Sequence, residues 1–201
     1  MVKKASAAIV DATIIDSNAR PKRMIEVSED RNETDSNVTL KELVDDDARW
    51  LKKGNKFHYG YKLFARTNEK GFIEKVHVTP ANEYEGKQLE PVLSNCEKGR
   101  KVLADKAYAS KDNREMLESN KLADGIMLKA VREKPLTKQQ KIENKEISKI
   151  RYRVEQTFGT LKRRFSFIRS SYLGLKKTTS QIYLKSMCVN LLKAVNLIKI
   201  A

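Results

Sequence analysis

Apolar residues in the first two thirds of the chain form short runs of the kind that build strands. Residues 7–15, "AAIVDATII", are β-branched and nearly continuously apolar, with Asp11 in the middle, which is typical of a buried central strand. Residues 56–79 alternate aromatic or β-branched positions with polar ones and turn at "NEKG", which predicts a two-stranded hairpin. Residues 100–109 predict a further buried strand, which delivers Asp105 at its C-terminal end.

Helical signals separate and follow these strands. A helix is expected from near Glu85, with Pro91 in its first turn or at a break, and a short helix is expected after the N-cap candidate Ser110. Residues 123–131 predict the last strand. The predicted order is therefore strand, hairpin, helix, strand, helix, strand and long helix.

The long helix is predicted by a seam of apolar residues spaced by three or four. The seam consists of Ile147, Ile150, Val154, Phe158, Leu161, Phe165 and Ile168. At about 100° per residue, Glu155 falls at the edge of this stripe, where its side chain can reach back toward the sheet. Residues 178–201 have apolar residues at near-helical spacing and predict a C-terminal helix, whose apolar positions suit core packing or a dimer face.

Composition adds a strong positive charge to this picture. The 201 residues are 40% hydrophobic, enough for the core of one domain, and their net charge of +15 indicates a polyanionic partner such as nucleic acid or an acidic membrane. Fourteen Lys or Arg against four Glu, a net +10, lie between residues 132 and 177. Residues 26–47 are rich in acids, Asn, Ser and Thr, and predict a polar loop.

Several classes of protein are excluded by what the sequence does not contain. No apolar run approaches the ~18 residues that span a bilayer, and the N-terminus does not fit a signal peptide, so a cytoplasmic protein is expected. The two Cys are isolated from each other and from the two His, so neither a zinc knuckle nor a disulfide framework can be drawn. Chemistry would therefore fall to carboxylates.

Three carboxylates occupy positions where an ionised side chain would need a cation beside it. Asp11 interrupts one buried strand, Asp105 ends another, and Glu155, the last acid of the chain, borders the apolar face of its most basic helix. A pair of divalent ions held by such acids is the chemistry of nucleases and polynucleotidyl transferases. The alternative is that the two Asp form turns at strand ends while Glu155 pairs with Arg151 one turn away.

The chain resembles a known family over most of its length. The blocks "IVDATIIDS", "HYGYKLF", "VTPANEYEG", "LADKAYAS", "ISKIRYRVEQTFGTLKRR", "YLGL" and "VNLLKAV" are similar, in the same order, to the catalytic part of DDE transposases in the group called insertion-sequence family five. The family's helix signature has an Arg four residues before its Glu and a Lys seven after, matched here by Arg151 and Lys162. It also has a Tyr where this chain has Ser148, a departure that leaves the metal ligands intact.

The resemblance implies an α/β fold of the RNase H-like class, a mixed five-stranded sheet flanked by helices, and a function in two-metal-ion DNA strand cleavage and strand transfer. Asp11, Asp105 and Glu155 would be the catalytic residues and would bind two Mg²⁺ (or Mn²⁺) ions. The DNA phosphates of transposon ends and target would be held by basic residues, which would add salt dependence to binding: Arg151, Arg153, Lys162, Arg163 and Arg164.

The organisation expected from the resemblance is one catalytic domain over residues 1–201 that acts as a homodimer on DNA at the nucleoid, without a membrane partner. It would lack the family's N-terminal end-recognition region. The alternative is a truncated, inactive remnant that acts as a DNA-binding protein or transposition inhibitor. A general RNase H-like nuclease fits the three acids but not the ordered blocks.

Three side chains outside this set have an open role. Trp50 suits either a base-stacking wedge or an anchor in the core or a lid, and Lys62 and Lys106 suit either a phosphate contact or a solvent-facing position.

Overall fold

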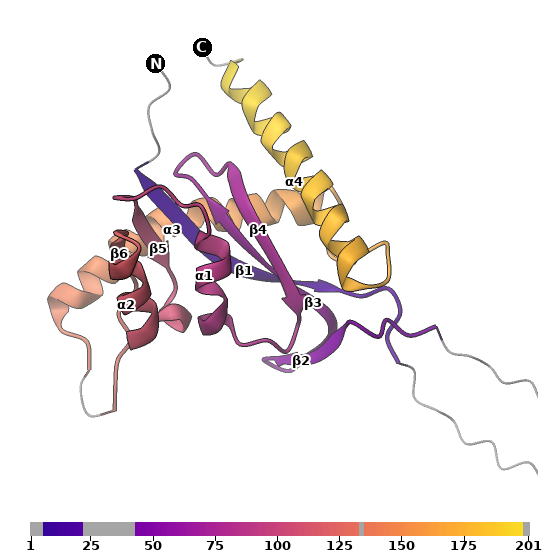
Figure 1. Ribbon diagram of the computed structural model, residues 1–201, viewed down its shortest axis with the longest axis horizontal. Coiled ribbons are helices and arrows are strands. Elements are labelled where there is room, and N and C mark those ends of the chain that lie inside the picture. Colours follow the sequence, from indigo (N-terminus) through magenta and orange to yellow (C-terminus); the bar gives the residue numbers. More distant parts are fainter. Residues whose placement is uncertain (1–5, 22–42, 133–134, 199–201) are drawn as a thin grey trace, which may run out of the picture.

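The computed structural model describes residues 6–21, 43–132 and 135–198, and they form one mixed sheet flanked by helices (Figure 1). The strands are β1 (Ala7–Asp16), β2 (Arg49–Lys53), β3 (Lys56–Thr67), β4 (Ile73–Pro80), β5 (Lys101–Ala104) and β6 (Ala123–Ile126). The helices are α1 (Leu89–Leu93), α2 (Lys111–Ser119), α3 (Lys138–Arg164) and α4 (Leu175–Ile198), with short 3-10 turns η1 (Glu85–Gln88) and η2 (Lys106–Tyr108).

The sheet combines antiparallel and parallel pairs. Its order is β2-β3-β1-β5-β6, and β4 also pairs with β3. β3 is antiparallel to β1, β2 and β4, whereas β1, β5 and β6 run parallel to one another. The mixed α/β class is as predicted, but the sheet of the described residues has six strands instead of five.

The additional strand, β2, carries little sequence signal for a strand. It is five residues long, "RWLKK", and four of its residues are exposed, so no alternation of apolar and polar positions marks it. It is defined by its pairing with the first half of β3 across a two-residue turn, since Lys53 faces Lys56.

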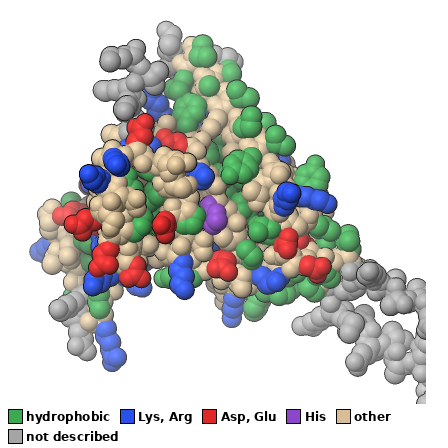
Figure 2. All heavy atoms as spheres, in the orientation of Figure 1, with side chains coloured by type: hydrophobic (Ala, Val, Ile, Leu, Met, Phe, Trp, Pro, Cys, Tyr) green, Lys and Arg blue, Asp and Glu red, His purple; other side chains and the backbone are tan. Residues whose placement is uncertain are grey.

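Two cores lie on the two faces of the sheet. Helices α3 and α4 cover one face, where Ile9 and Ile15 of β1 pack, and α1 and α2 cover the other, where Ala8 and Val10 pack. β1 is therefore buried on both sides, which explains its nearly continuous apolar run. Figure 2 shows hydrophobic side chains along the outer side of α4.

The long helix α3 begins at a capping box. The Thr137 hydroxyl accepts from the Gln140 backbone N–H, and the Gln140 side chain accepts from the Thr137 N–H. The predicted seam is buried at Val154, Phe158 and Leu161 but leaves Ile150 and Ile168 exposed. Because α3 ends at Arg164, the last two seam positions lie beyond the helix.

Other predicted boundaries shift by a few residues. The strands expected over 100–109 and 123–131 are only four residues each, and the helix expected near Glu85 begins as a 3-10 turn. The C-terminal helix starts at Leu175; its positions Leu184 and Leu191 are exposed rather than in the core. Of the predicted polar loop 26–47, residues 26–42 lie outside the described part of the chain.

Candidate active site

Asp11 lies in the middle of β1 and is half-buried. Its Oδ1 accepts a hydrogen bond from the Ala12 N–H at 2.9 Å, and its Oδ2 lies 3.2 Å from Nη2 of Arg151. Burial raises the pKa of the Asp11 carboxyl; Arg151 lowers it, and the nearby charges of Asp105 and Glu155 raise it further. The pKa remains above its usual value, so the guanidinium does not fully compensate the buried charge.

Asp105 follows the last residue of β5, and the parallel pairing of β1 with β5 places it beside Asp11. The register pairs Ile9 with Leu103, so the two Asp each lie two residues further along adjacent strands. The Asp105 Oδ1 accepts from the Lys106 N–H at 2.6 Å as the N-cap of η2. It also lies 3.9 Å from Nη1 of Arg151.

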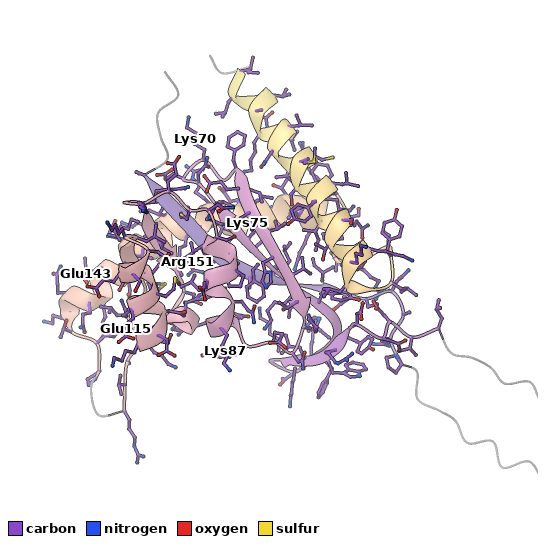
Figure 3. The ribbon with its side chains drawn as sticks, in the orientation of Figure 1. Lys70, Lys75, Lys87, Glu115, Glu143 and Arg151 are labelled. Atoms are coloured by element: carbon purple, nitrogen blue, oxygen red, sulfur yellow. The ribbon has the colours of Figure 1, made fainter. Side chains whose placement is uncertain are left out.

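Arg151 of α3, labelled in Figure 3, is buried. Its guanidinium lies beside both aspartates. Its Nη1 is also 3.5 Å from Sδ of Met127, and its Nε has no hydrogen-bond partner among the described residues. The sequence predicted a phosphate contact for this side chain. In the structure its guanidinium lies beside Asp11 and Asp105, and the phosphate contact stays a prediction.

Glu155 lies one turn further along α3 and is exposed. Among the described residues, Arg151 pairs with Asp11 and Asp105 and forms no ion pair with Glu155. The alternative of a salt bridge between Glu155 and Arg151 within α3 is therefore wrong. Glu155 is still near enough to raise the pKa of Asp11. Nevertheless, within the described ranges no three His, Cys, Asp or Glu side chains are gathered closely enough to hold a metal ion.

The remaining predicted DNA-binding residues lie along α3. Arg153, Arg163 and Arg164 are exposed, whereas Lys162 is half-buried. Burial lowers the pKa of Lys162, and the nearby charge of Lys53 lowers it further. Arg163 and Arg164 also lie in the last turn of α3, where cations stabilise the helix dipole irrespective of any ligand.

One cavity among the described residues lies away from the candidate acids. A space of about 690 Å³ separates the first half of α3 from β5 and β6, and its lining includes Leu103, Leu128 and Ile147 but none of the three candidate acids. Asp105 is partly exposed and Glu155 is exposed, so a ligand can reach both side chains from solvent.

Comparison with known proteins decides the family. The family model described as the transposase DDE domain matches residues 3–191. The chain belongs to this family. It is 48% identical over 196 residues to the transposase for insertion sequence element IS1106 of Neisseria meningitidis serogroup B, and the match covers 97% of this chain and 67% of that protein. No solved structure matches the chain.

The family assignment confirms the predicted fold and enzyme class. DDE transposase domains are RNase H-like, they act on DNA, and they generally use divalent metal ions; the chain is a DDE-type transposase domain of an insertion sequence. No helix of the described residues is long and apolar enough to cross a membrane.

The three candidate acids have the chemistry of ligands for a divalent metal ion. In the described structure they are not close enough together to hold one. Carboxylate oxygens are the ligands that Mg²⁺ and Mn²⁺ prefer. Asp11 and Asp105 already share one cation, the Arg151 guanidinium, and Asp11 still has a raised pKa. A complete ligand set would need Glu155 to turn inward and Arg151 to release at least one carboxylate.

One buried group near this site, Tyr108, was missed in the sequence, and a second, Lys62, is placed differently from its expected roles. Tyr108, three residues after Asp105, is fully buried and its hydroxyl has no partner among the described residues; burial, followed by the charges of Glu85 and Asp11, raises its pKa. Lys62 is buried as well: its Nζ donates to the Glu83 carbonyl at 2.7 Å and lies 3.5 Å from Oε1 of Glu85. Neither expected role of Lys62, phosphate contact or solvent-facing position, describes this placement, whereas Lys106 is exposed.

Proposed function

We propose that the chain is the catalytic part of an insertion-sequence transposase that cleaves DNA strands and transfers them by two-metal-ion catalysis. The observation that carries this proposal is the pairing of Asp11 and Asp105, on adjacent parallel strands, around one buried cation. Two carboxylates that share a single cation favour the binding of divalent ions.

The proposal gives each residue a separate role. Asp11, Asp105 and Glu155 would hold two Mg²⁺ or Mn²⁺ ions, which when bound activate water or a 3′-hydroxyl and stabilise the leaving oxygen. Arg151 would keep the two aspartates in place before the ions bind and would then turn its guanidinium toward a DNA phosphate. The other phosphates would be held by Arg153, Lys162, Arg163 and Arg164.

The partners in this proposal are DNA, as transposon end and as target at the nucleoid, and a second copy of the chain. We take residues 1–201 as one catalytic domain. A homodimer is supported by the apolar residues that α4 exposes on the side away from the sheet, such as Leu184, Met187 and Leu191.

A second candidate function is a catalytically silent DNA-binding protein that inhibits transposition. The observation in its favour is that no three metal-binding side chains among the described residues are gathered into a ligand set. The basic side of α3 would bind DNA equally well in both cases, so binding alone does not separate the two functions.

The separating experiment is a supercoiled-plasmid assay with Mg²⁺ or Mn²⁺, which scores nicking and the joining of a 3′-hydroxyl oligonucleotide. Asp105→Ala should lower metal-dependent nicking at least about 100-fold, because even partners of metal ligands contribute 10- to 100-fold. Asp112→Ala, which removes an exposed acid of α2, is the matched control and should keep full activity. No activity in the parent protein, with salt-sensitive DNA binding retained, would favour the silent DNA-binding protein.

A further inference from the structure

The β2–β3 hairpin, residues 49–57, is a basic element that neither the catalytic acids nor α3 accounts for. It turns through Gly54, whose φ of 59° suits glycine, and Asn55, between the paired residues Lys53 and Lys56. It contains no acid and four basic residues, Arg49, Lys52, Lys53 and Lys56. β2 lies at the end of the sheet order, at the lower edge of Figure 1.

One face of this hairpin is a row of aromatic rings. The cross-strand pairs Trp50–Tyr59 and Lys52–Phe57 place these four side chains on the same face, because directly opposed residues of an antiparallel pair share a face. The Trp50 and Tyr59 ring centroids are 5.0 Å apart, and Nζ of Lys52 lies 5.4 Å from the Phe57 ring centroid. Trp50 is 45% exposed and Phe57 is 63% exposed.

The base of the hairpin is fixed while its end is open to solvent. The Tyr59 hydroxyl donates to the Asp45 carbonyl at 2.8 Å, and Nδ1 of His58 lies 2.9 Å from Oδ1 of Asp16, the last residue of β1. Because Asp16 is five residues after Asp11 on the same strand, the hairpin base lies about 17 Å from the catalytic acids at ~3.3 Å per residue. That distance equals about five steps of one DNA strand at ~3.4 Å each.

The hairpin is also close to the basic helix. Lys53, next to the hairpin turn, is near enough to Lys162 of α3 for their charges to interact. A nucleic-acid strand that leaves the phosphate contacts proposed for α3 can therefore continue onto the hairpin.

Protection of an exposed sheet edge explains the lysines of this hairpin but not its aromatic residues. Lysines on an exposed edge strand prevent edge-to-edge pairing of sheets. Exposed Trp and Phe side chains have the opposite effect, because apolar side chains promote edge-to-edge association. Protection of the edge therefore does not account for Trp50 and Phe57. Alternating aromatic rings and lysines are what proteins use to hold unpaired nucleotides, with bases on the rings and phosphates on the ammonium groups.

We propose that the β2–β3 hairpin binds unpaired DNA, with bases stacked on Trp50 and Phe57 and a phosphate held by Lys52 on the same face. Lys53 and Lys56 pair with each other on the opposite face beside the turn, where they add positive charge for the continuing strand. This inference rests on the proposed function, since it adds to a DNA strand-transfer site the surface that holds single-stranded nucleotides about five steps from the cut. Figure 2 shows hydrophobic and basic side chains together at the lower edge of the molecule, where Figure 1 places β2.

Trp50 provides a direct test because it is the single tryptophan of the chain. Titration of the full chain with an oligothymidine should quench the tryptophan fluorescence, since a stacked base contacts the indole. Inorganic polyphosphate, which offers phosphates without bases, should bind without comparable quenching. Unchanged fluorescence at saturating oligothymidine, with binding confirmed by anisotropy of a labelled oligonucleotide, would overturn the proposal.

Substitutions supply the second test. Phe57→Ala and Trp50→Ala should each weaken binding of the oligothymidine roughly 5- to 100-fold, the range that loss of one stacked base gives, and should affect blunt duplex much less. Tyr172→Ala, which removes an aromatic ring of similar exposure (54%) between α3 and α4, is the matched control and should bind as the parent does. An equal loss on duplex and single strand, or no loss in Phe57→Ala, would contradict base stacking.

The two proposals fail separately. Asp105→Ala should keep the fluorescence quenching while losing metal-dependent nicking, because it lies outside the hairpin. A parent protein that nicks nothing but still shows quenching by oligothymidine would refute the proposed catalysis and leave the hairpin site standing.

Discussion

At the residue scale, the Arg151 guanidinium neutralises two carboxylates from a buried position. Arg151→Gln would leave Asp11 buried without its cation, so the free energy of unfolding should fall by about 3 kcal/mol. Urea titration of the variant measures this loss, and Mg²⁺ should restore more stability to the variant than it adds to the parent, because the ion replaces the missing charge.

The control for this prediction is Arg153→Gln on the exposed side of the same helix, where the change should stay within about 0.5 kcal/mol. Equal losses in the two variants would show that Arg151 does not act as the counter-ion of the acidic pair.

Asp11 should decrease the stability of the fold at neutral pH. The pKa of its carboxyl is raised, chiefly by burial, so the folded chain disfavours the ionised form relative to the unfolded chain. The penalty is absent below the unfolded pKa, grows as pH rises through the raised folded pKa, and is constant above it. Asp11→Asn should therefore be more stable than the parent at pH 7, and this advantage should shrink toward pH 3.5. Urea unfolding of both proteins at the two pH values checks the sign; an advantage that grows at low pH would contradict it.

At the scale of elements, a buried Asp45 joins β1, β3 and α4. Its carboxylate accepts from the Ser17 hydroxyl at 2.6 Å, the Tyr61 hydroxyl at 2.7 Å and the Gly174 N–H at 3.0 Å. Asp45→Ala leaves these donors without a partner and should lower the free energy of unfolding by about 3 kcal/mol. Asp46→Ala, one residue later and exposed, should change thermal unfolding little. Similar melting temperatures for both variants would refute this role.

Asp45 also illustrates what the sequence could not reveal about elements. It lies within the stretch interpreted as a polar loop, and its partners Tyr61 and Gly174 are far away in the chain, so no local pattern marks it as buried. β1, β3, β4 and the middle of α3 were predictable because their own periodicity determines them. The position of Arg151 was not, because its partners come from two strands that only the sheet register brings together.

At the scale of the whole molecule, α4 is apolar on two sides. Its inner side packs on the sheet through Ile182 and Val189, while Leu184 and Leu191 are exposed on its outer side. A cluster of exposed apolar residues marks a contact with another protein, so we expect a homodimer that covers this outer side. The joint change Leu184→Glu and Leu191→Glu should convert a dimer to a monomer in sedimentation equilibrium, whereas Val131→Glu, at an exposed position outside α4, should not. A parent protein that remains monomeric at high concentration would exclude this interface.

The net charge of +15 makes DNA affinity depend on salt across the whole surface, and the dependence can be divided among residues. Each phosphate contact removed should lower the slope of log affinity against log salt by about 0.9. Arg163→Ala combined with Arg164→Ala should lower it by about 1.8 if both hold phosphates, and by nothing if they serve only the end of α3. Asp105→Ala should keep the slope of the parent, because this residue is assigned to metal. Anisotropy titrations at four salt concentrations measure the slopes, and a changed slope in Asp105→Ala would mean that the acids and the basic helix do not act as separate surfaces.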